Sequence, residues 1–201
     1  YMQPLISELK ELWELGTQTY DAFTDQSFNL LATLLWTISD FPGYAMLSGW
    51  STKGKLACPV CHYETSSMYL KNSKKMCYMS HRKFLDVDHK WRFDKKRFNG
   101  EIELGTCPDP LTGTEIMELL AGFENRFGKN NVKKVKTDSP FKKKSIFFEL
   151  PYWRHNLCRH NLDVMHIEKN ICDKIIGTLL NIGGKSKDHL NARKDLQEMG
   201  I

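Results

Sequence analysis

The sequence predicts an α/β fold in which helices pack on a central buried strand and a loop-rich insertion follows that strand. Three observations carry this prediction. Hydrophobic residues make up 41% of the chain's 201 residues, enough for one core with a satellite module. An apolar run covers residues 28–38, with helical apolar spacing before it and again later in the chain. A polar segment with closely spaced cysteines follows the run.

The first fifty residues hold a predicted helix and the predicted strand. In "QPLISELKELWELG" the apolar residues recur every three or four positions between Pro4, which suits a first helical turn, and Gly16, which ends the pattern. The run over residues 28–38 favours a strand buried on both faces, with a buried helix as the alternative. Asp40 would then stand at the C-terminal end of a central strand, where open α/β sheets place functional groups.

The predicted insertion contains the ligand types of a zinc site. Cys58, Cys61, Cys77 and His81 form the pattern C-x2-C-x15-C-x3-H. Zinc prefers four tetrahedral ligands and accepts thiolates and imidazoles, and an intervening loop can bring two close pairs together. His89 is an alternative ligand in place of Cys77. We therefore expect structural zinc here; the competing interpretations are buried thiols beside exposed histidines, or a redox pair of cysteines.

The next segment combines a helix with a basic loop. "LTGTEIMELLAGFENRFG" begins with a capping box of Thr112 and Glu115 and offers Gly128 as a C-cap. The apolar face of this predicted helix consists of Ile116, Leu119, Leu120, Phe123 and Phe127. "KNNVKKVKTDSPFKKKS" is rich in lysine without an apolar period, which indicates a basic loop.

The last segment is predicted to hold a short strand and two helices. The strand-like "SIFFELPYW" is interrupted by Pro151, and a final polar helix begins near Ser186. The longer helix between them has an apolar face that should point inward, made of Met165, Ile171, Ile175, Leu179 and Ile182. Asp163 and His166 are three residues apart, so they either point at one site or serve as an N-cap and a surface residue.

These patterns divide the chain into four segments. Residues 1–50 form a core part with a helix and a strand, and residues 51–100 form the cysteine-bearing insertion. Residues 101–145 contribute a helix and a basic loop, and residues 146–201 return a strand and helices to the core.

Charge and composition restrict the classes of function. A net charge of +5 and a pI near 8.8 suit an anionic partner. In "RKFLDVDHKWRFDKKRF" basic residues are interleaved with aromatic residues, which can neutralise phosphates and stack on bases, although most charge runs are simply solvated. No run of eighteen apolar residues and no signal-peptide pattern is present, so we predict neither a membrane span nor secretion, and we expect reduced cysteines.

Four stretches of the chain carry a family resemblance. Taken in order, "QPLISELKELW", "WTISDFPGYAMLSGWSTKGKLACPVC", "CYMSHRKFL" and "ELPYWRHNLCRHNLDVMHIEKN" closely resemble the plant transposases of CACTA-type (En/Spm-like) DNA transposons. The resemblance extends from Gln3 to about Leu196 and rests on long motifs.

The resemblance implies a partial RNase H-like core with a zinc-stabilised insertion. In such transposases three carboxylates hold two Mg²⁺ ions, which activate water and then a DNA 3′-hydroxyl. Asp40 matches the family's second catalytic aspartate, and "DVMH" matches its D-x-x-H motif, which gives Asp163 and His166 a site-supporting role. The resemblance also implies transposon-end DNA as the partner, a nuclear location, and a homo-oligomer in the full-length parent.

The departures from the family's pattern limit what this chain is expected to do alone. The family's first catalytic aspartate is expected before "QPLI" and its third acid beyond the D-x-x-H helix. We therefore expect an interior fragment that is catalytically silent by itself, with Mg²⁺ bound only in the complete parent site. The rival hypothesis is a noncatalytic zinc-bearing module, domesticated or relic, that binds nucleic acid or protein.

Overall fold

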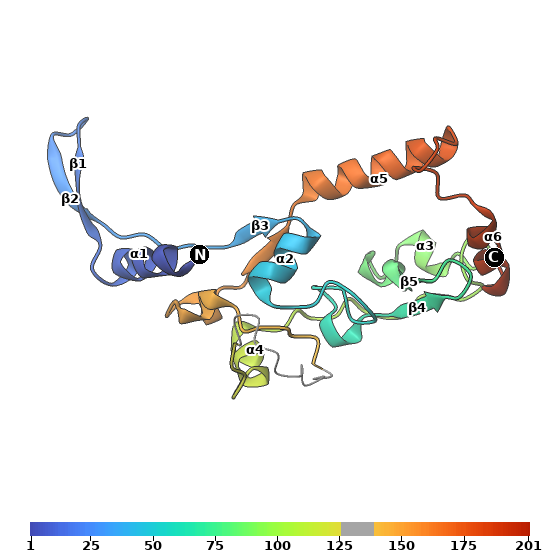
Figure 1. The fold of residues 1–201 in the computed structure, drawn as a ribbon, viewed down its shortest axis with the longest axis horizontal. Helices are drawn as coiled ribbons and strands as arrows, with labels where there is room; N and C mark the ends of the chain where they lie inside the picture. Colours follow the sequence, from blue (N-terminus) through green and yellow to red (C-terminus); the bar gives the residue numbers. More distant parts are fainter. Residues whose placement is uncertain (126–138) are drawn as a thin grey trace. The chain divides into compact units, whose positions relative to one another are not determined.

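The computed structural model describes residues 1–125 and 139–201, and the chain divides into two compact units. Unit 1 comprises Tyr1–Trp50 and Leu111–Leu162, and unit 2 comprises Ser51–Pro110 and Asp163–Ile201. The described residues form a mixed α/β structure whose strands pair into small two-stranded sheets (Figure 1).

Helix α1 (Gln3–Glu14) supplies one wall of the unit 1 core. Its Ile6 is fully buried, and the cluster around it is completed by Phe147, Leu150, Tyr152 and Trp153. The helix ends where predicted, because Gly16 adopts a left-handed φ of +72°.

Two short 3₁₀ helices replace the strand predicted in "SIFFELPYW". These are η3 (Ile146–Glu149) and η4 (Trp153–His155). The Phe147 ring stacks on Trp153 with ring centroids 4.8 Å apart. In an extended strand, residues six positions apart would be separated by roughly 20 Å, so the chain must turn for both rings to reach one core.

The apolar run over residues 28–38 is not the single buried strand that the sequence predicts. It begins in the exposed strand β2 (Gln26–Leu30), which pairs with β1 (Thr17–Asp21) as a hairpin, and it ends in β3 (Thr37–Ser39). Side chains satisfy the backbone between these strands: the Leu34 N–H donates to the Tyr152 hydroxyl at 3.1 Å, and Asn156 donates to two carbonyls of the run. These groups therefore have partners without a sheet ladder.

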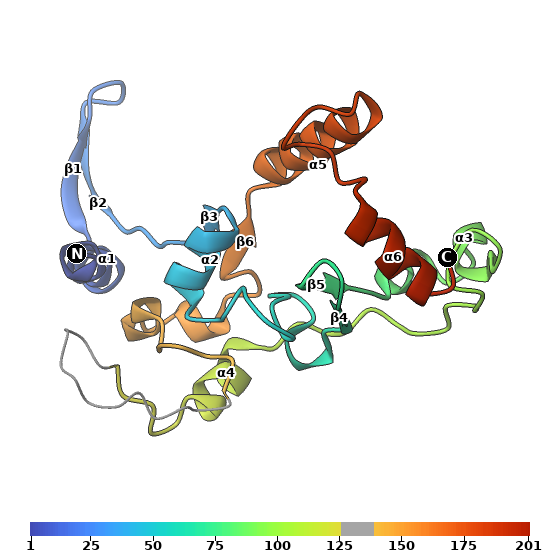
Figure 2. The same cartoon turned by 45° about the vertical axis from the view of Figure 1, so that its right-hand side comes forward.

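Strand β3 pairs in parallel with β6 (His160–Leu162), and the two lie side by side in both views (Figures 1 and 2). Thr37 is opposite His160, and Ser39 is opposite Leu162. The pairing is reinforced by a side-chain hydrogen bond of 2.7 Å between Thr37 Oγ1 and His160 Nδ1. Helix α2 (Phe41–Ser48) follows β3 directly.

Helix α4 (Gly113–Leu119) begins with the capping box that the sequence predicts. The Glu115 N–H donates to Thr112 Oγ1 at 3.2 Å, and the Thr112 N–H donates to Glu115 Oε2 at 2.7 Å. The helix ends earlier than predicted, at Leu119; Phe127 and Gly128, assigned to its face and its C-cap, lie outside the described residues.

In unit 2 the hairpin of β4 (Ser67–Leu70) and β5 (Lys75–Tyr78) is attached to helix α6 (Leu190–Glu198). The buried Asp195 accepts hydrogen bonds from the backbone N–H groups of Asn72 and Ser73, both at 2.9 Å. Burial raises the pKa of Asp195, but hydrogen bonds from the side chains and backbone N–H groups of Ser73 and Asn72 outweigh burial and lower the pKa to about 2. A carboxylate on the final helix therefore holds the hairpin turn.

Two arginines organise the basic stretch "RKFLDVDHKWRFDKKRF", which is mostly irregular. It contains only η2 (His81–Phe84) and α3 (Lys90–Phe93) within its described residues. Arg92 is buried and donates to three carbonyls, including that of Gly105 at 2.6 Å. Arg82 donates to the carbonyls of Trp91, Arg92, Asp94 and Glu101. These guanidinium groups bind the protein's own backbone.

Helix α5 (Val164–Leu179) does not bury the apolar face that the sequence assigns to it. The exposed fractions are 78% for Met165, 54% for Ile171, 54% for Ile175, 78% for Leu179 and 38% for Ile182. Within the described part of unit 2, only the last turn is closely covered, where Gly177 lies beneath Lys185. Helical spacing identifies residues that share a face, but it does not specify what packs on that face.

Candidate functional site

Asp40 lies directly after the C-terminal end of β3, at the N-cap of α2. Its Oδ1 accepts a hydrogen bond of 2.7 Å from the Gly43 N–H, and its side chain is otherwise on the exposed surface. A Cβ at position 43 would stand 2.8 Å from that oxygen, so glycine leaves room for the cap. The strand before Asp40 is short and half-buried, in contrast to the central buried strand that the sequence predicts.

The partner strand β6 is also followed by an aspartate. Leu162 is opposite Ser39, and the next residue, Asp163, caps α5 by accepting a hydrogen bond of 3.2 Å from the His166 N–H. Asp163 is therefore the N-cap residue of α5, and the His166 side chain is exposed. Each strand of the parallel pair thus leads through an aspartate cap into a helix.

Aromatic side chains pack around His160 of the parallel pair and bury most of its ring. Its ring lies 5.4 Å from Trp153, 5.7 Å from Phe147 and 5.8 Å from Tyr44. Burial, together with the neighbouring Arg159 charge, lowers the pKa of His160 to about 4. The imidazole is therefore neutral at pH 7 and suited to hydrogen bonding with Thr37. Sequence spacing did not single out this residue, because burial by distant aromatic residues leaves no local motif.

Acidification should destabilise unit 1 through His160. Because the folded-state pKa lies below the ordinary value of 6.5, the folded state prefers the neutral ring. Its stabilisation is complete above pH 6.5 and is lost as pH falls toward 4, by about 3 kcal/mol. Urea unfolding at a series of pH values measures this loss. His160→Gln should remove that part of the pH dependence, whereas the exposed control His155→Gln should keep it; equal profiles for both variants would contradict the assignment.

Cys58 and Cys61 form a compact turn in unit 2. The Cys61 N–H donates to Cys58 Sγ at 3.4 Å, and the His62 N–H donates to the Cys58 carbonyl at 3.0 Å. His62 has a φ of +46°, an uncommon conformation for a residue other than glycine and one that occurs often at ligand clamps. Burial raises the pKa of the Cys61 thiol to about 11; Cys58 adds to the rise and Lys83 opposes it. No sequence signal indicated the interaction between Lys83 and Cys61, because Lys83 is not part of the ligand pattern.

The other predicted zinc ligands are not gathered with this pair. Cys77 lies in β5 with its sulfur 3.8 Å from Met79 Sδ, and His81 is exposed at the start of η2. His89 caps α3, where its Nδ1 accepts a hydrogen bond of 3.2 Å from the Trp91 N–H. Across residues 1–125 and 139–201, no three His, Cys, Asp or Glu side chains are grouped closely enough to hold a metal ion. Of the four ligands that a tetrahedral zinc site requires, only Cys58 and Cys61 therefore lie together.

Comparisons with known proteins add a family assignment to this geometry. A family model described as "Transposase family tnp2" matches residues 1–123, which include Asp40, the pair of Cys58 and Cys61, and the β4–β5 hairpin. Searches of the curated proteins and of the solved structures gave no match. Among the helices in the described ranges, none has the length and apolar character needed to cross a membrane.

Proposed function

The chain belongs to the tnp2 transposase family, and we propose that it is part of the catalytic region of a CACTA-type (En/Spm-like) plant DNA transposase. The reaction of the full-length parent would be cleavage of DNA strands at transposon ends and their transfer to a target. The observation that carries this proposal is the position of Asp40: an exposed carboxylate immediately after a parallel strand, within the family-matched residues.

The site residues in this proposal have distinct roles. Asp40 supplies one catalytic carboxylate, while Asp163 and His166 support the site from the start of α5. A helix-capping hydrogen bond orients each of the two aspartates, which supports these roles. An RNase H-like arrangement of the complete catalytic region is part of the proposal, and β3, β6 and α2 would belong to it.

The residues present do not fit a complete Mg²⁺ site. A two-metal site needs several carboxylates, and the described residues contain no group of three or more metal-ligating side chains. We therefore assign Mg²⁺ only to the full-length parent, where further acids would join Asp40. This chain alone is expected to be catalytically silent.

DNA is the partner that the family implies, and a nuclear location and a homo-oligomeric parent complete the proposal. The net charge of +5 supports an anionic partner. The test is a strand-cleavage assay of the full-length protein on transposon-end DNA, with and without Mg²⁺. Metal-dependent nicking at the ends is expected, and absence of cleavage with folded, DNA-bound protein would contradict the proposal.

Structural zinc is also proposed, with Cys58, Cys61, Cys77 and His81 as ligands and His89 as the alternative to Cys77. The turn at Cys58 and the left-handed conformation of His62 support it. Bound zinc would be expected to draw β5 and η2 toward the cysteine turn.

Replacing Cys58 with serine should lower the zinc content from about one ion per chain toward zero, because the remaining donors cannot complete a tetrahedral site. Hydrogen exchange should increase over residues 51–100 and remain unchanged in unit 1. Metal analysis of the purified protein is the primary measurement, and Cys107→Ser is the matched control, since Cys107 lies outside the ligand pattern. Wild-type protein that contains no zinc would refute the proposal.

A second candidate function is a noncatalytic zinc-bearing module that binds nucleic acid or protein. The observation that favours it is that Asp40 already serves as a helix cap, a sufficient structural reason for its presence. DNA binding that survives Asp40→Asn but is lost with a zinc chelator, without any strand cleavage by the full-length protein, would select this alternative.

A further inference from the structure

The basic stretch of unit 2, residues 82–98, keeps its phenylalanine and tryptophan side chains in contact with water. It contains seven lysines and arginines against three aspartates. Its exposed aromatic residues are Phe84, Trp91, Phe93 and Phe98. Single exposed apolar residues are common on proteins, but several large rings concentrated in one short segment indicate an interaction surface.

Arg82 links two of these aromatic residues. Its guanidinium lies over the Phe98 ring, 4.4 Å from the ring centroid. It also donates to the Trp91 carbonyl at 3.1 Å, to the Asp94 carbonyl at 3.2 Å and to Asn99 Oδ1 at 2.9 Å. The backbone at Trp91 and the ring of Phe98 are therefore both attached to one guanidinium group.

The Trp91 side chain is oriented by a neighbour and remains accessible. The rings of His89 and Trp91 have centroids 5.3 Å apart and meet at 66°, an edge-on contact. His89 also caps α3 by accepting a hydrogen bond from the Trp91 N–H. Because 44% of Trp91 is still exposed, its indole ring is available to a ligand without unfolding of the stretch.

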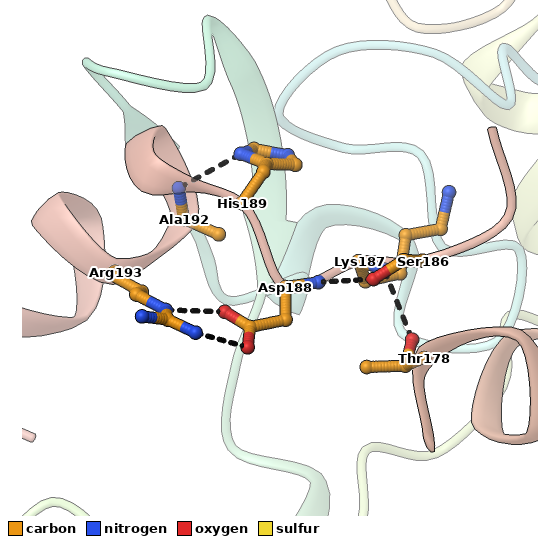
Figure 3. A network of polar contacts seen from close by, with 7 residues as sticks. All are labelled: Thr178, Ser186, Lys187, Asp188, His189, Ala192 and Arg193. Atoms are coloured by element: carbon orange, nitrogen blue, oxygen red, sulfur yellow. Dashed lines mark hydrogen bonds and ion pairs between the residues drawn. The ribbon is translucent and has the colours of Figure 1, made fainter. Parts of the chain in front are cut away.

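Basic side chains that face solvent accompany the two rings. The exposed ones nearest in sequence are Lys90, Lys95, Lys96 and Arg97. Arg97 is paired with Asp94 at 3.5 Å. Arg193 of α6 is likewise held within the protein, since both oxygens of Asp188 accept hydrogen bonds of 2.7 Å from its guanidinium (Figure 3). We therefore assign the external contact to the three lysines beside Trp91 and Phe98.

We propose that the basic stretch binds single-stranded DNA, with bases stacked on Trp91 and Phe98 and phosphates bound by the three lysines. This inference rests on the proposed function, which makes DNA the partner, and it adds that the DNA in contact is unpaired. Bases inside a duplex are stacked on one another and cannot reach a protein ring, whereas unpaired bases can. Every base has a π-face, so the contact should not depend on DNA sequence.

The test is DNA binding by the 201-residue chain, measured by fluorescence anisotropy with a labelled single strand and with the duplex of the same sequence. The wild-type chain should bind the single strand more tightly than the duplex at equal salt concentration. Trp91→Ala should weaken single-strand binding by roughly 5- to 150-fold, the effect of losing one stacked base. Duplex binding should change much less.

Two tryptophan variants separate stacking from folding. Trp91→Phe keeps an aromatic ring and should restore most of the affinity for the single strand. Trp36→Ala removes a tryptophan of similar exposure, 46%, from unit 1 and should leave the affinity unchanged.

Two lysine variants test the phosphate contacts. In the variant with Lys90, Lys95 and Lys96 all replaced by glutamine, the slope of log affinity against log salt should fall by about 0.7 for each lysine that contacts a phosphate. The control carries the same charge change at exposed positions of unit 2 outside the stretch and should keep nearly the wild-type slope; its substitutions are Lys53→Gln, Lys55→Gln and Lys194→Gln.

The outcomes distinguish this inference from the proposed function. Equal affinity for single strand and duplex, or equal losses in Trp91→Ala and Trp36→Ala, overturns the stacking surface and leaves strand cleavage by the full-length protein to decide the function. Tighter binding to the RNA strand of the same sequence overturns the assignment to DNA. Absence of single-strand binding by the wild-type chain overturns the inference directly.

Discussion

Replacing Asp40 with asparagine in the full-length protein is expected to reduce strand cleavage by roughly 10³-fold or more, with little change in folding. A metal-assisted phosphoryl transfer gains several kcal/mol from correctly placed ions, and each 1.36 kcal/mol corresponds to a tenfold change in rate. Asparagine keeps an oxygen that can accept the Gly43 hydrogen bond, but it removes the negative charge. The measurement is the single-turnover cleavage rate on transposon-end DNA.

The capping role of Asp40 allows the chemical effect to be separated from the structural one. Asparagine and aspartate are similarly good N-caps, whereas alanine costs about 1 kcal/mol. Asp40→Ala should therefore lose both activity and stability, and Asp40→Asn should lose activity alone. Asp109→Asn, at an exposed position in unit 2, is the control for charge removal. Cleavage by Asp40→Asn at the wild-type rate would show that Asp40 is a helix cap only.

Local sequence rules predicted the elements whose determinants lie within a few residues. Thr112 and Glu115 specify the start of α4 because both partners of the capping box are three positions apart. Asp163 caps α5 for the same reason, and Gly16 ends α1 because its conformation is left-handed. These interactions need no information about the rest of the chain.

The sequence could not predict the elements whose hydrogen-bond partners are distant. Residues 28–38 have the composition of a buried strand, yet part of their backbone is satisfied by Tyr152 and Asn156, more than a hundred positions away. Likewise, the apolar period of α5 is real, but burial depends on what packs there. Hydrophobic residues prefer to be buried, but their sequence does not identify which other residues cover them.

The candidate site residues also differ in whether their determinants are local or distant in the sequence. The spacing of Cys58 and Cys61 predicts a metal-ligand pair, and their turn is compact in the structure. His160 was not singled out, because its surroundings are assembled from separate segments, such as Trp153 beside β6. Spacing rules describe a site well only when one segment contributes most of its ligands.

Trp153→Ala should lower the free energy of unfolding of unit 1 by about 3–5 kcal/mol, the range typical of removing a buried tryptophan or phenylalanine side chain. The side chain is fully buried, with its ring stacked on Phe147 and set at an angle to His160. Removing it leaves a cavity in the core, and both Phe147 and His160 lose their contact with the indole ring. Because single domains are stable by only about 5–15 kcal/mol, the variant should unfold at much lower urea concentration.

A matched substitution and a second measurement make this prediction specific. Trp36→Ala removes the same side chain in the same unit, but Trp36 is 46% exposed, so the expected loss is about 1 kcal/mol. Loss of the Trp153 ring should also admit water to His160 and return its pKa toward 6.5, since burial is the main cause of its low value. The acid-induced loss of stability should therefore be smaller in Trp153→Ala than in wild type. Equal effects of the two tryptophan substitutions would contradict the burial of Trp153, because a side chain buried in a packed core and one half in water cannot cost the same to remove.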